Sequence, residues 1–164
     1  MNDTACGETA GVSVISADRC TPLQGATMPV VVVLDRLRSA FNVGNIFRLA
    51  DALRTERIVA CGYTAVPPHP KLAKTARGCD EIVPCTSSPT AIDAIAGLHA
   101  DGYTVYGVET TEASTLVWDE TLVFPAAIVF GNEALGACPD ALTACDRLLR
   151  IPAVGIKNSV NVAN

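Results

Sequence analysis

Metal-ligand and dithiol motifs are missing from this sequence. Its seven cysteines are scattered with no Cys-x-x-Cys pair, and its two histidines, His69 and His99, lie in different segments. A structural zinc site needs four such ligands at close spacing, and a redox pair needs two neighbouring thiols. We therefore expect no bound metal, and free thiols in a reducing compartment. A nucleophilic role for Cys138 is a weaker alternative to a structural thiol.

Long hydrophobic runs are also missing. No stretch approaches the roughly eighteen apolar residues that a membrane-spanning helix needs. Residues 1–20 carry an early acidic residue and no basic region followed by an apolar block, so they do not predict a secretory signal peptide. We expect no membrane association and a cytoplasmic location.

Positive charge is scarce but concentrated. The chain has 12 Lys and Arg against 17 Asp and Glu, a net charge of −5. Nucleic-acid-binding proteins are usually basic because phosphate contacts dominate their affinity, so this balance counts against an extended nucleic-acid surface. A local basic patch is still possible within residues 36–77, which hold Arg36, Arg38, Arg48, Arg54, Arg57, Lys71, Lys74 and Arg77.

The chain is long enough and apolar enough for one domain with its own core. It has 164 residues, of which 49% are hydrophobic, which also argues against disorder. Residues 1–28 are rich in Thr, Ser, Gly and Ala without a steady period, which predicts an N-terminal arm. The domain is expected over residues 29–164.

Strand and helix patterns alternate along the domain. Apolar runs predict strands at residues 30–35, 57–61, 81–85, 103–109, 126–130 and 148–151. Helical spacing or capping signals predict helices at residues 43–54, 88–100 and 139–145, with Asn42 and Ser88 as N-caps. Three prolines predict a loop over residues 63–70. The alternation predicts an α/β fold with a parallel sheet, in which ligands bind at the carboxyl ends of the strands.

Two polar segments follow predicted strands near the ends where ligands would bind. In residues 39–48, Asn42 and Gly44 suit a turn into a helix, and Arg48 leaves the apolar face, where a surface ion pair with Asp51 is the simpler interpretation. In residues 131–137, small residues let the backbone approach a ligand closely. Glu133 is then either a reactive group or an acid in the first turn of a helix. The phosphate-binding fingerprints GxxxxGK[ST] and GxGxxG are absent.

A third polar segment spans residues 151–161. Pro152 ends the preceding strand and Gly155 permits a turn. Ser159 and Asn161 offer hydroxyl and amide groups, while Val160 between them points the other way. This lining suits a ligand with an apolar ring and a polar rim, such as adenosine.

Together, the three segments resemble the signature motifs of the SpoU/TrmH family of ribose 2′-O-methyltransferases, in the SPOUT class. The first motif, Asn-x-Gly-x-x-x-Arg, is matched by Asn42, Gly44 and Arg48. The second motif is matched by Gly131, Asn132, Glu133 and Gly136. The third motif is matched by Ile151, Pro152, Ser159, Asn161 and Val162, with Val160 in place of the usual Leu. Residues 67–83 resemble the family's linker, so the resemblance covers residues 30–164.

The resemblance implies a parallel-sheet α/β/α sandwich with a C-terminal trefoil knot. It implies S-adenosylmethionine as the cofactor, contacted by Gly131, Ile151 and Val160, with Val108 as a further contact. It also implies a homodimer with the active site near the subunit interface. The implied reaction is methyl transfer to a ribose 2′-hydroxyl of tRNA or rRNA, without a metal.

The resemblance assigns catalysis to Arg48, with Asn42, Glu133, Ser159 and Asn161 orienting Arg48 and the substrate. In the family this arginine is proposed as the base that takes the hydroxyl proton. A guanidinium normally stays protonated in proteins. Holding an RNA phosphate and stabilising the developing alkoxide is therefore an equally physical role.

Two other functions remain open from the sequence. A non-catalytic relative that binds S-adenosylmethionine or RNA is favoured by the acidic composition, whereas the joint presence of the motif residues favours the enzyme. A generic nucleotide-binding α/β domain is disfavoured by the missing glycine fingerprints. The resemblance also implies a further helix after the third motif. With the sequence ending at Asn164, we expect that helix to be missing and dimerisation and cofactor binding to be weak.

Overall fold

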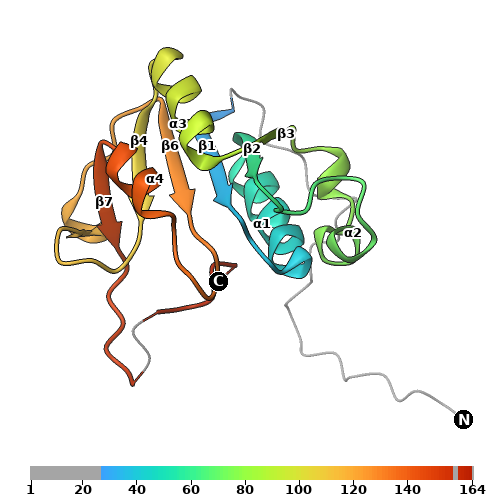
Figure 1. Cartoon of the computed structure of the whole chain (residues 1–164). Helices are drawn as coiled ribbons and strands as arrows, with labels where there is room; N and C mark the ends of the chain where they lie inside the picture. The colour runs from blue at the N-terminus through green and yellow to red at the C-terminus, as the bar shows by residue number, and fades with distance from the viewer. Residues whose placement is uncertain (1–26, 157–158, 164) are drawn as a thin grey trace, which may run out of the picture.

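A parallel β-sheet forms the centre of the molecule (Figure 1). The computed structural model describes residues 27–156 and 159–163, so most of the predicted N-terminal arm lies outside the described residues. The strands lie in the order β3-β2-β1-β6-β4-β7-β5, and each neighbouring pair is parallel. Their bounds are Met28–Asp35 (β1), Thr55–Cys61 (β2), Cys85–Ser88 (β3), Thr104–Val108 (β4), Thr115–Leu116 (β5), Ala126–Phe130 (β6) and Arg147–Arg150 (β7). The predicted parallel α/β fold is confirmed.

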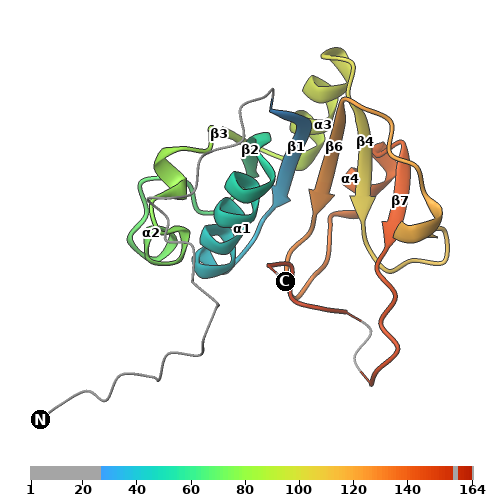
Figure 2. The ribbon, with the colours of Figure 1, turned by 180° about the vertical axis from the view of Figure 1, so that it is seen from behind.

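Helices cover both faces of this sheet (Figures 1 and 2). Helices α1 (Ala40–Leu53) and α2 (Pro70–Ala76) pack on one face, and α3 (Ala91–Ala100) and α4 (Pro139–Ala144) pack on the other. The side chains of β1 pack against the helices on both faces of the sheet, because Val31 and Val33 face α3 and α4 while Val32 and Leu34 face α1. A strand buried on both sides has no polar alternation, which explains its unbroken apolar sequence.

Two local predictions are wrong around the prolines. The loop predicted over residues 63–70 ends at His69, because Pro70 takes the first position of α2, where its missing N–H is not needed. His69 Nδ1 accepts a 3.4 Å hydrogen bond from the Leu72 amide as the cap of that helix. The third strand is β3 rather than residues 81–85, because a 3₁₀ turn occupies Cys79–Glu81.

Both predicted N-caps are also wrong by a few residues. Ser39 caps α1, accepting a 3.2 Å hydrogen bond from the Asn42 amide, so Asn42 is the third residue of the helix. Thr90 rather than Ser88 caps α3, accepting a 3.1 Å bond from the Asp93 amide. The sequence offers several capping side chains at each place, and the path of the preceding strand selects among them.

Gly44 has a packing role rather than the predicted turn role. It lies within α1, and a Cβ there would overlap Thr75 Oγ1 and the Leu72 carbonyl of α2. The missing side chain therefore brings the two helices into contact. Thr75 Oγ1 also donates a 2.9 Å hydrogen bond to the Phe41 carbonyl, which ties the helices together at the same point.

The sheet face beside α1 is only partly covered. In Figure 2, β6 and β4 are seen with no helix of the described residues in front of them. Ile128 and Phe130 of β6 point to this side and are half-buried. Among the described helices, none is long and apolar enough to cross a membrane.

Candidate functional site

Two of the three polar segments meet where β6 ends and α1 begins. Because Ser39 caps α1, the Asn42 side chain is free to reach across to the segment after β6. Its Nδ2 donates a 2.9 Å hydrogen bond to Glu133 Oε1. Residues 91 positions apart in the sequence therefore touch at one edge of the sheet.

Glu133 is the centre of this contact. Besides Asn42, its carboxylate accepts hydrogen bonds from the amides of Arg38 at 2.9 Å and Ser39 at 3.1 Å. Partial burial alone would raise the pKa of Glu133, but these hydrogen bonds outweigh it and hold the pKa below its usual value. The carboxylate also sits at the positive end of the α1 dipole, which stabilises its charge. The prediction of Glu133 as an acid in the first turn of its own following helix is wrong, because the helix whose N-terminus it faces is α1.

Asn132 organises the loop that carries Glu133. Its side chain is buried, and Oδ1 accepts hydrogen bonds from the amides of Ala134 at 2.8 Å and Leu135 at 3.0 Å. Its Nδ2 donates to the Arg36 carbonyl at 2.6 Å and to the Tyr63 hydroxyl at 2.9 Å. In the sequence, Asn132 stands out only as a small residue of the second motif. The available signal was its place directly after a buried strand, where an amide can satisfy several turn amides at once.

Two carboxylates from the strands on either side of β6 hold the far end of this loop. Asp35, at the end of β1, accepts a 3.0 Å hydrogen bond from the Cys138 amide. Glu109, just after β4, accepts a 3.0 Å bond from the Ala137 amide. Gly131 makes the turn possible, because a Cβ there would overlap the backbone of Ala137. The close backbone approach expected at Gly131 is thus made by the protein's own loop.

The C-terminal segment returns to the same place. Asn161 Nδ2 donates a 3.4 Å hydrogen bond to Asn42 Oδ1, and Asn161 Oδ1 accepts one from the Ala163 amide at 3.0 Å. Val162 and Ala163 pack against the core cluster around α1. Three of the five predicted catalytic residues, Asn42, Glu133 and Asn161, are therefore brought together. Ser159 is exposed and has no hydrogen bond to another described residue.

Arg48 lies apart from this cluster. It is exposed and follows Gly44 by four residues, so it shares the face of α1 that packs against α2. Asn42 is six residues earlier, which is about 240° around the helix and about 9 Å along it. The Arg48 side chain has no hydrogen bond or ion pair with another described residue. Asp51, its predicted partner, instead accepts a 3.7 Å hydrogen bond from the Cys79 thiol.

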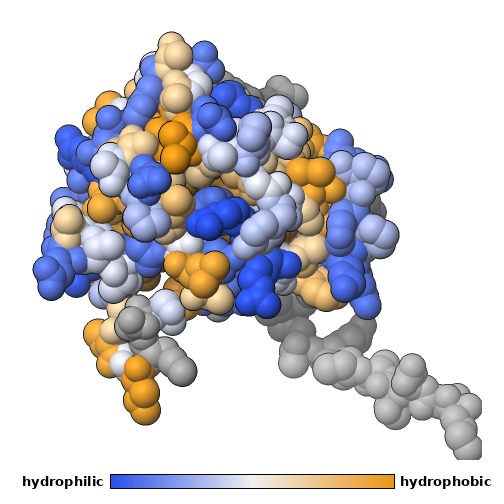
Figure 3. Space-filling model, viewed as in Figure 1, coloured by the Kyte–Doolittle hydropathy of each residue, from blue (hydrophilic) through white to orange (hydrophobic). Residues whose placement is uncertain are grey.

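The residues expected to contact a cofactor end three adjacent strands. Val108 pairs with Phe130, which precedes Gly131, and with Leu149, two residues before Ile151. Ile151 is 42% exposed, and Val160, on the returning segment, is 58% exposed. Val154 and Ile156 are fully exposed, and in Figure 3 the segment after β7 carries hydrophobic surface below the body of the molecule. These apolar side chains leave a surface that an apolar ligand or a partner would cover.

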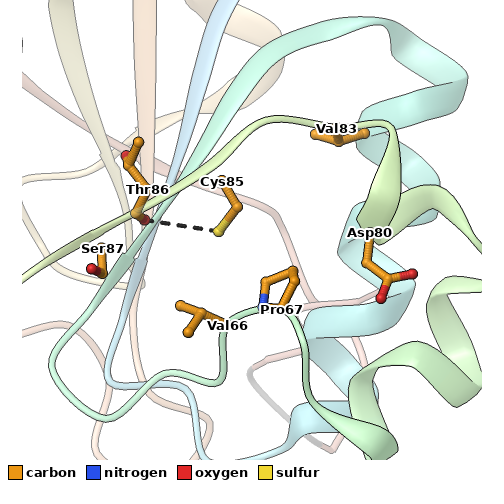
Figure 4. Close-up of a pocket in the computed structure, with 7 residues that line it drawn as sticks. All are labelled: Val66, Pro67, Asp80, Val83, Cys85, Thr86 and Ser87. Atoms are coloured by element: carbon orange, nitrogen blue, oxygen red, sulfur yellow. Dashed lines mark hydrogen bonds between the residues drawn. The ribbon is translucent and has the colours of Figure 1, made fainter.

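Two hollows in the surface are described, and the larger lies away from this cluster, at the outer edge of β3 (Figure 4). It has a volume of about 280 Å³ and is lined by Val66, Pro67, Asp80, Val83, Cys85, Thr86 and Ser87, none of them a predicted site residue. Cys85 points into it, and burial raises the pKa of this thiol to about 11, so it is not a reactive thiolate. A smaller hollow of about 160 Å³ lies where Arg36 and Cys138 face the start of α3.

The basic residues of the 36–77 segment divide into paired and exposed groups. Arg36 forms an ion pair with Asp35, and Arg57 pairs with Glu56 and stacks 5.5 Å over the Tyr103 ring. The exposed ones lie at the start of α1 and on the α1–α2 side of the molecule, and they are Arg38, Arg48, Lys71, Lys74 and Arg77. The predicted basic patch is therefore narrower than the sequence indicated.

Comparison with known proteins matches this arrangement. The model of the SpoU rRNA Methylase family matches residues 29–164. A 23S rRNA (uridine(2479)-2′-O)-methyltransferase of Streptomyces viridochromogenes is 31% identical over 81% of this chain and 48% of that protein. The 23S rRNA (guanosine-2′-O-)-methyltransferase RlmB of Vibrio parahaemolyticus is 30% identical over 82% of this chain and 54% of that protein. The chain thus spans about half the length of these relatives.

A solved structure agrees with the sequence relatives. The AdoMet-bound rRNA methyltransferase of Sinorhizobium meliloti superposes with a TM-score of 0.76 and 27% identity, over 82% of this chain and 51% of that one. The parallel sheet and the polar cluster at its carboxyl edge therefore define a SPOUT-class methyltransferase fold. The chain belongs to the SpoU rRNA methylase family.

The Glu133 contacts predict a pH-dependent stability. The pKa of Glu133 is lower in the folded than in the unfolded protein, so its stabilisation is present above the unfolded value of about 4.3 and is lost as pH falls below it. Glu133→Gln should lower the free energy of unfolding at pH 7 by about 0.3–1 kcal/mol and flatten the acid limb of the stability curve. Urea denaturation between pH 3 and 7 measures both effects.

Glu112→Gln is the matched control for this experiment, because Glu112 is exposed and has no hydrogen bond to another described residue. It should leave the acid limb unchanged. Both variants keep Asp146, whose pKa is lowered by a hydrogen bond from the Val105 amide and by His99, so some acid dependence remains. An unchanged acid limb in Glu133→Gln would show that its contacts do not stabilise the fold.

Proposed function

We propose that this chain binds S-adenosylmethionine and methylates a ribose 2′-hydroxyl in tRNA or rRNA. One observation carries the proposal: Asn42, Glu133 and Asn161, one from each motif segment, form a hydrogen-bonded chain at the carboxyl edge of the sheet. The relatives support it, since their names describe 2′-O-methylation of 23S rRNA. The bound cofactor would supply an electrophilic methyl group on a sulfonium.

The residues at the ends of β4, β6 and β7 fit this cofactor. Val108 and the backbone of Gly131 flank the edge, and Ile151 and Val160 supply exposed apolar surface for an adenine ring. Glu109 accepts hydrogen bonds from the amides of Thr110 and Ala137 beside them, so the edge is rigid before binding. We propose that residues 151–156 and 159–163 enclose the cofactor and complete a trefoil knot, as the position of Asn161 beside Asn42 supports.

The chain's own residues would position the reacting hydroxyl. Asn42 and Asn161 present amide groups, and the position of Ser159 on the same returning segment would add a hydroxyl. Glu133 holds Asn42 in place and keeps the start of α1 fixed. Arg48 lies on the α2 side, apart from these residues, so we propose that it acts through the RNA: it would bind a phosphate next to the reacting ribose and offset the negative charge that grows on the ribose oxygen.

Assembly and location are also proposals. The half-covered face over Ile128 and Phe130 of β6 leaves apolar surface beside α1, which supports a homodimer formed through this region. We propose residues 29–164 as the methyltransferase domain, working in the cytoplasm and without a metal ion. Among the described residues, no group of three or more His, Cys, Asp or Glu side chains is placed to hold one.

The test combines binding with transfer. Isothermal titration calorimetry should show S-adenosylmethionine binding to the chain, and the tritiated methyl group should pass to bulk tRNA or rRNA. A ribose 2′-O-methyl product is recognised because it blocks alkaline cleavage of the adjacent phosphodiester. Binding without transfer would support the non-catalytic alternative. The absence of both binding and transfer would overturn the proposal.

A further inference from the structure

We infer that Tyr63 and Arg36 form a stacking platform for an unpaired nucleobase of the RNA, next to the methylation site. The inference rests on the proposed function, because it names how the RNA is held at that site. Tyr63 is 58% exposed, whereas Tyr103 is half-buried and Tyr106 is fully buried. An exposed aromatic ring at the carboxyl edge of β2 has an open face for a planar ligand.

Tyr63 is exposed but firmly placed. Its hydroxyl accepts the 2.9 Å hydrogen bond from Asn132 Nδ2. Before it, the Gly62 amide donates a 3.1 Å bond to the Ser88 carbonyl. After it, Thr64 Oγ1 is buried between the Leu37 amide at 2.9 Å and the Leu34 carbonyl at 3.0 Å. A ring whose hydroxyl is hydrogen-bonded, between two neighbours that are themselves fixed, loses little conformational entropy when a ligand covers it.

Arg36 lies against the same turn. Its Cγ is 3.0 Å from the position of a Cβ on Gly62, so its side chain runs directly beside the residue that precedes Tyr63. The planar guanidinium is held in one orientation by two hydrogen bonds to the buried Asp35, at 2.9 Å from Nε and 3.0 Å from the terminal nitrogen. It remains one-third exposed. A guanidinium fixed in this way presents a plane rather than a mobile charge.

One amide connects the Tyr63 side chain and the Arg36 backbone to the loop over residues 131–137. Asn132 Nδ2 bonds the Arg36 carbonyl and the Tyr63 hydroxyl, and Asn132 precedes Glu133, which binds Asn42. The pair therefore lies beside the site, on the β1–β2 side. Sequence-specific RNA recognition uses single-stranded bases stacked on aromatic rings and Arg guanidinium planes, and every base offers such a face. The ligand class is a base flanking the methylated ribose, splayed out of a helix.

Variants of Tyr63 separate stacking from mere loop support. The probe is a single-stranded oligoribonucleotide carrying 2-aminopurine, whose fluorescence falls when it stacks. Tyr63→Ala should weaken binding about 5- to 100-fold, the loss expected for one base–aromatic stack. Tyr63→Phe keeps the ring but loses the bond to Asn132, and should stay within about 3-fold of the original protein. S-adenosylmethionine affinity should not change in either variant.

Trp118→Ala is the control, because Trp118 is a 72% exposed aromatic near β5, at the opposite edge of the sheet. It should leave oligonucleotide binding unchanged. Equal binding by Tyr63→Ala and the original protein would overturn the inference, as would an equal loss in Tyr63→Phe and Tyr63→Ala. If the original protein methylates RNA and Tyr63→Ala binds the probe normally, the inference alone fails. If the original protein neither binds S-adenosylmethionine nor transfers methyl groups, the proposed function fails instead.

Discussion

Arg48→Ala is expected to slow methyl transfer by about 100- to 10,000-fold, the range for losing a positioned proton-transfer or charge-stabilising group. Affinity for S-adenosylmethionine should stay within about two-fold. The Arg48 side chain is exposed on the α1–α2 side and has no hydrogen bond to another described residue, so its removal leaves no buried partner unsatisfied. Single-turnover transfer of tritiated methyl groups to RNA, with calorimetry for the cofactor, measures the two quantities separately.

Arg48→Lys distinguishes the two proposed roles of Arg48. A lysine keeps the positive charge for an RNA phosphate and an alkoxide but loses the planar fork, so a partial recovery of rate supports electrostatic stabilisation. Arg147→Ala is the matched control, because Arg147 is exposed and pairs with Glu120 rather than with the site. A parallel loss of cofactor affinity in Arg48→Ala would show that Arg48 acts on structure. An unchanged transfer rate would remove it from the mechanism.

Gly131→Ala is expected to lower the free energy of unfolding by about 1–3 kcal/mol or more, as overpacking does. The added Cβ would overlap the backbone of Ala137, and a backbone atom cannot rotate away as a side chain can. The melting temperature should fall by about 2–4 °C for each kcal/mol. Because the same loop carries Glu133, methyl transfer should fall as well.

Gly97→Ala is the control for this substitution. Gly97 lies inside α3, and a Cβ there would meet no atom within 4 Å. Alanine should stabilise this helix by about 0.5–1 kcal/mol, since glycine is disfavoured in helix interiors. Thermal unfolding followed by circular dichroism compares both variants. A Gly131→Ala protein that melts at the original temperature would contradict the close packing of the 131–137 loop.

Much of the fold could be predicted from local patterns. The strand predicted at residues 126–130 matches β6, whereas β1 and β2 each begin two residues before the predicted apolar runs. Errors occurred where several residues compete for one role, as at Ser39 and Asn42. A cap is decided by which side chain the incoming strand brings over the free amides. Strand β5, with two residues, is too short to carry a periodic signal.

The site was predicted as a set of residues, but not as a geometry. Asn42, Glu133 and Asn161 were singled out by their motifs, and the structure joins them by hydrogen bonds. The hydrogen bonds from Asn132 to Arg36 and Tyr63 could not be predicted, because these partners follow two other strands. The direction of the Arg48 side chain depends on which face of α1 packs against α2. Gly44 marks that face, because its missing side chain allows the two helices to come into contact.

By itself, the sequence determined the α/β class, the three polar segments and the family resemblance, because hydrophobic period and motif spacing are local properties of the chain. Only the tertiary structure decided that β6 lies between β1 and β4, which brings Glu133 to the start of α1. It also decided that Arg48 faces α2. The physical reason is that contacts between distant residues depend on strand order and helix phase, which are set by packing of the whole core.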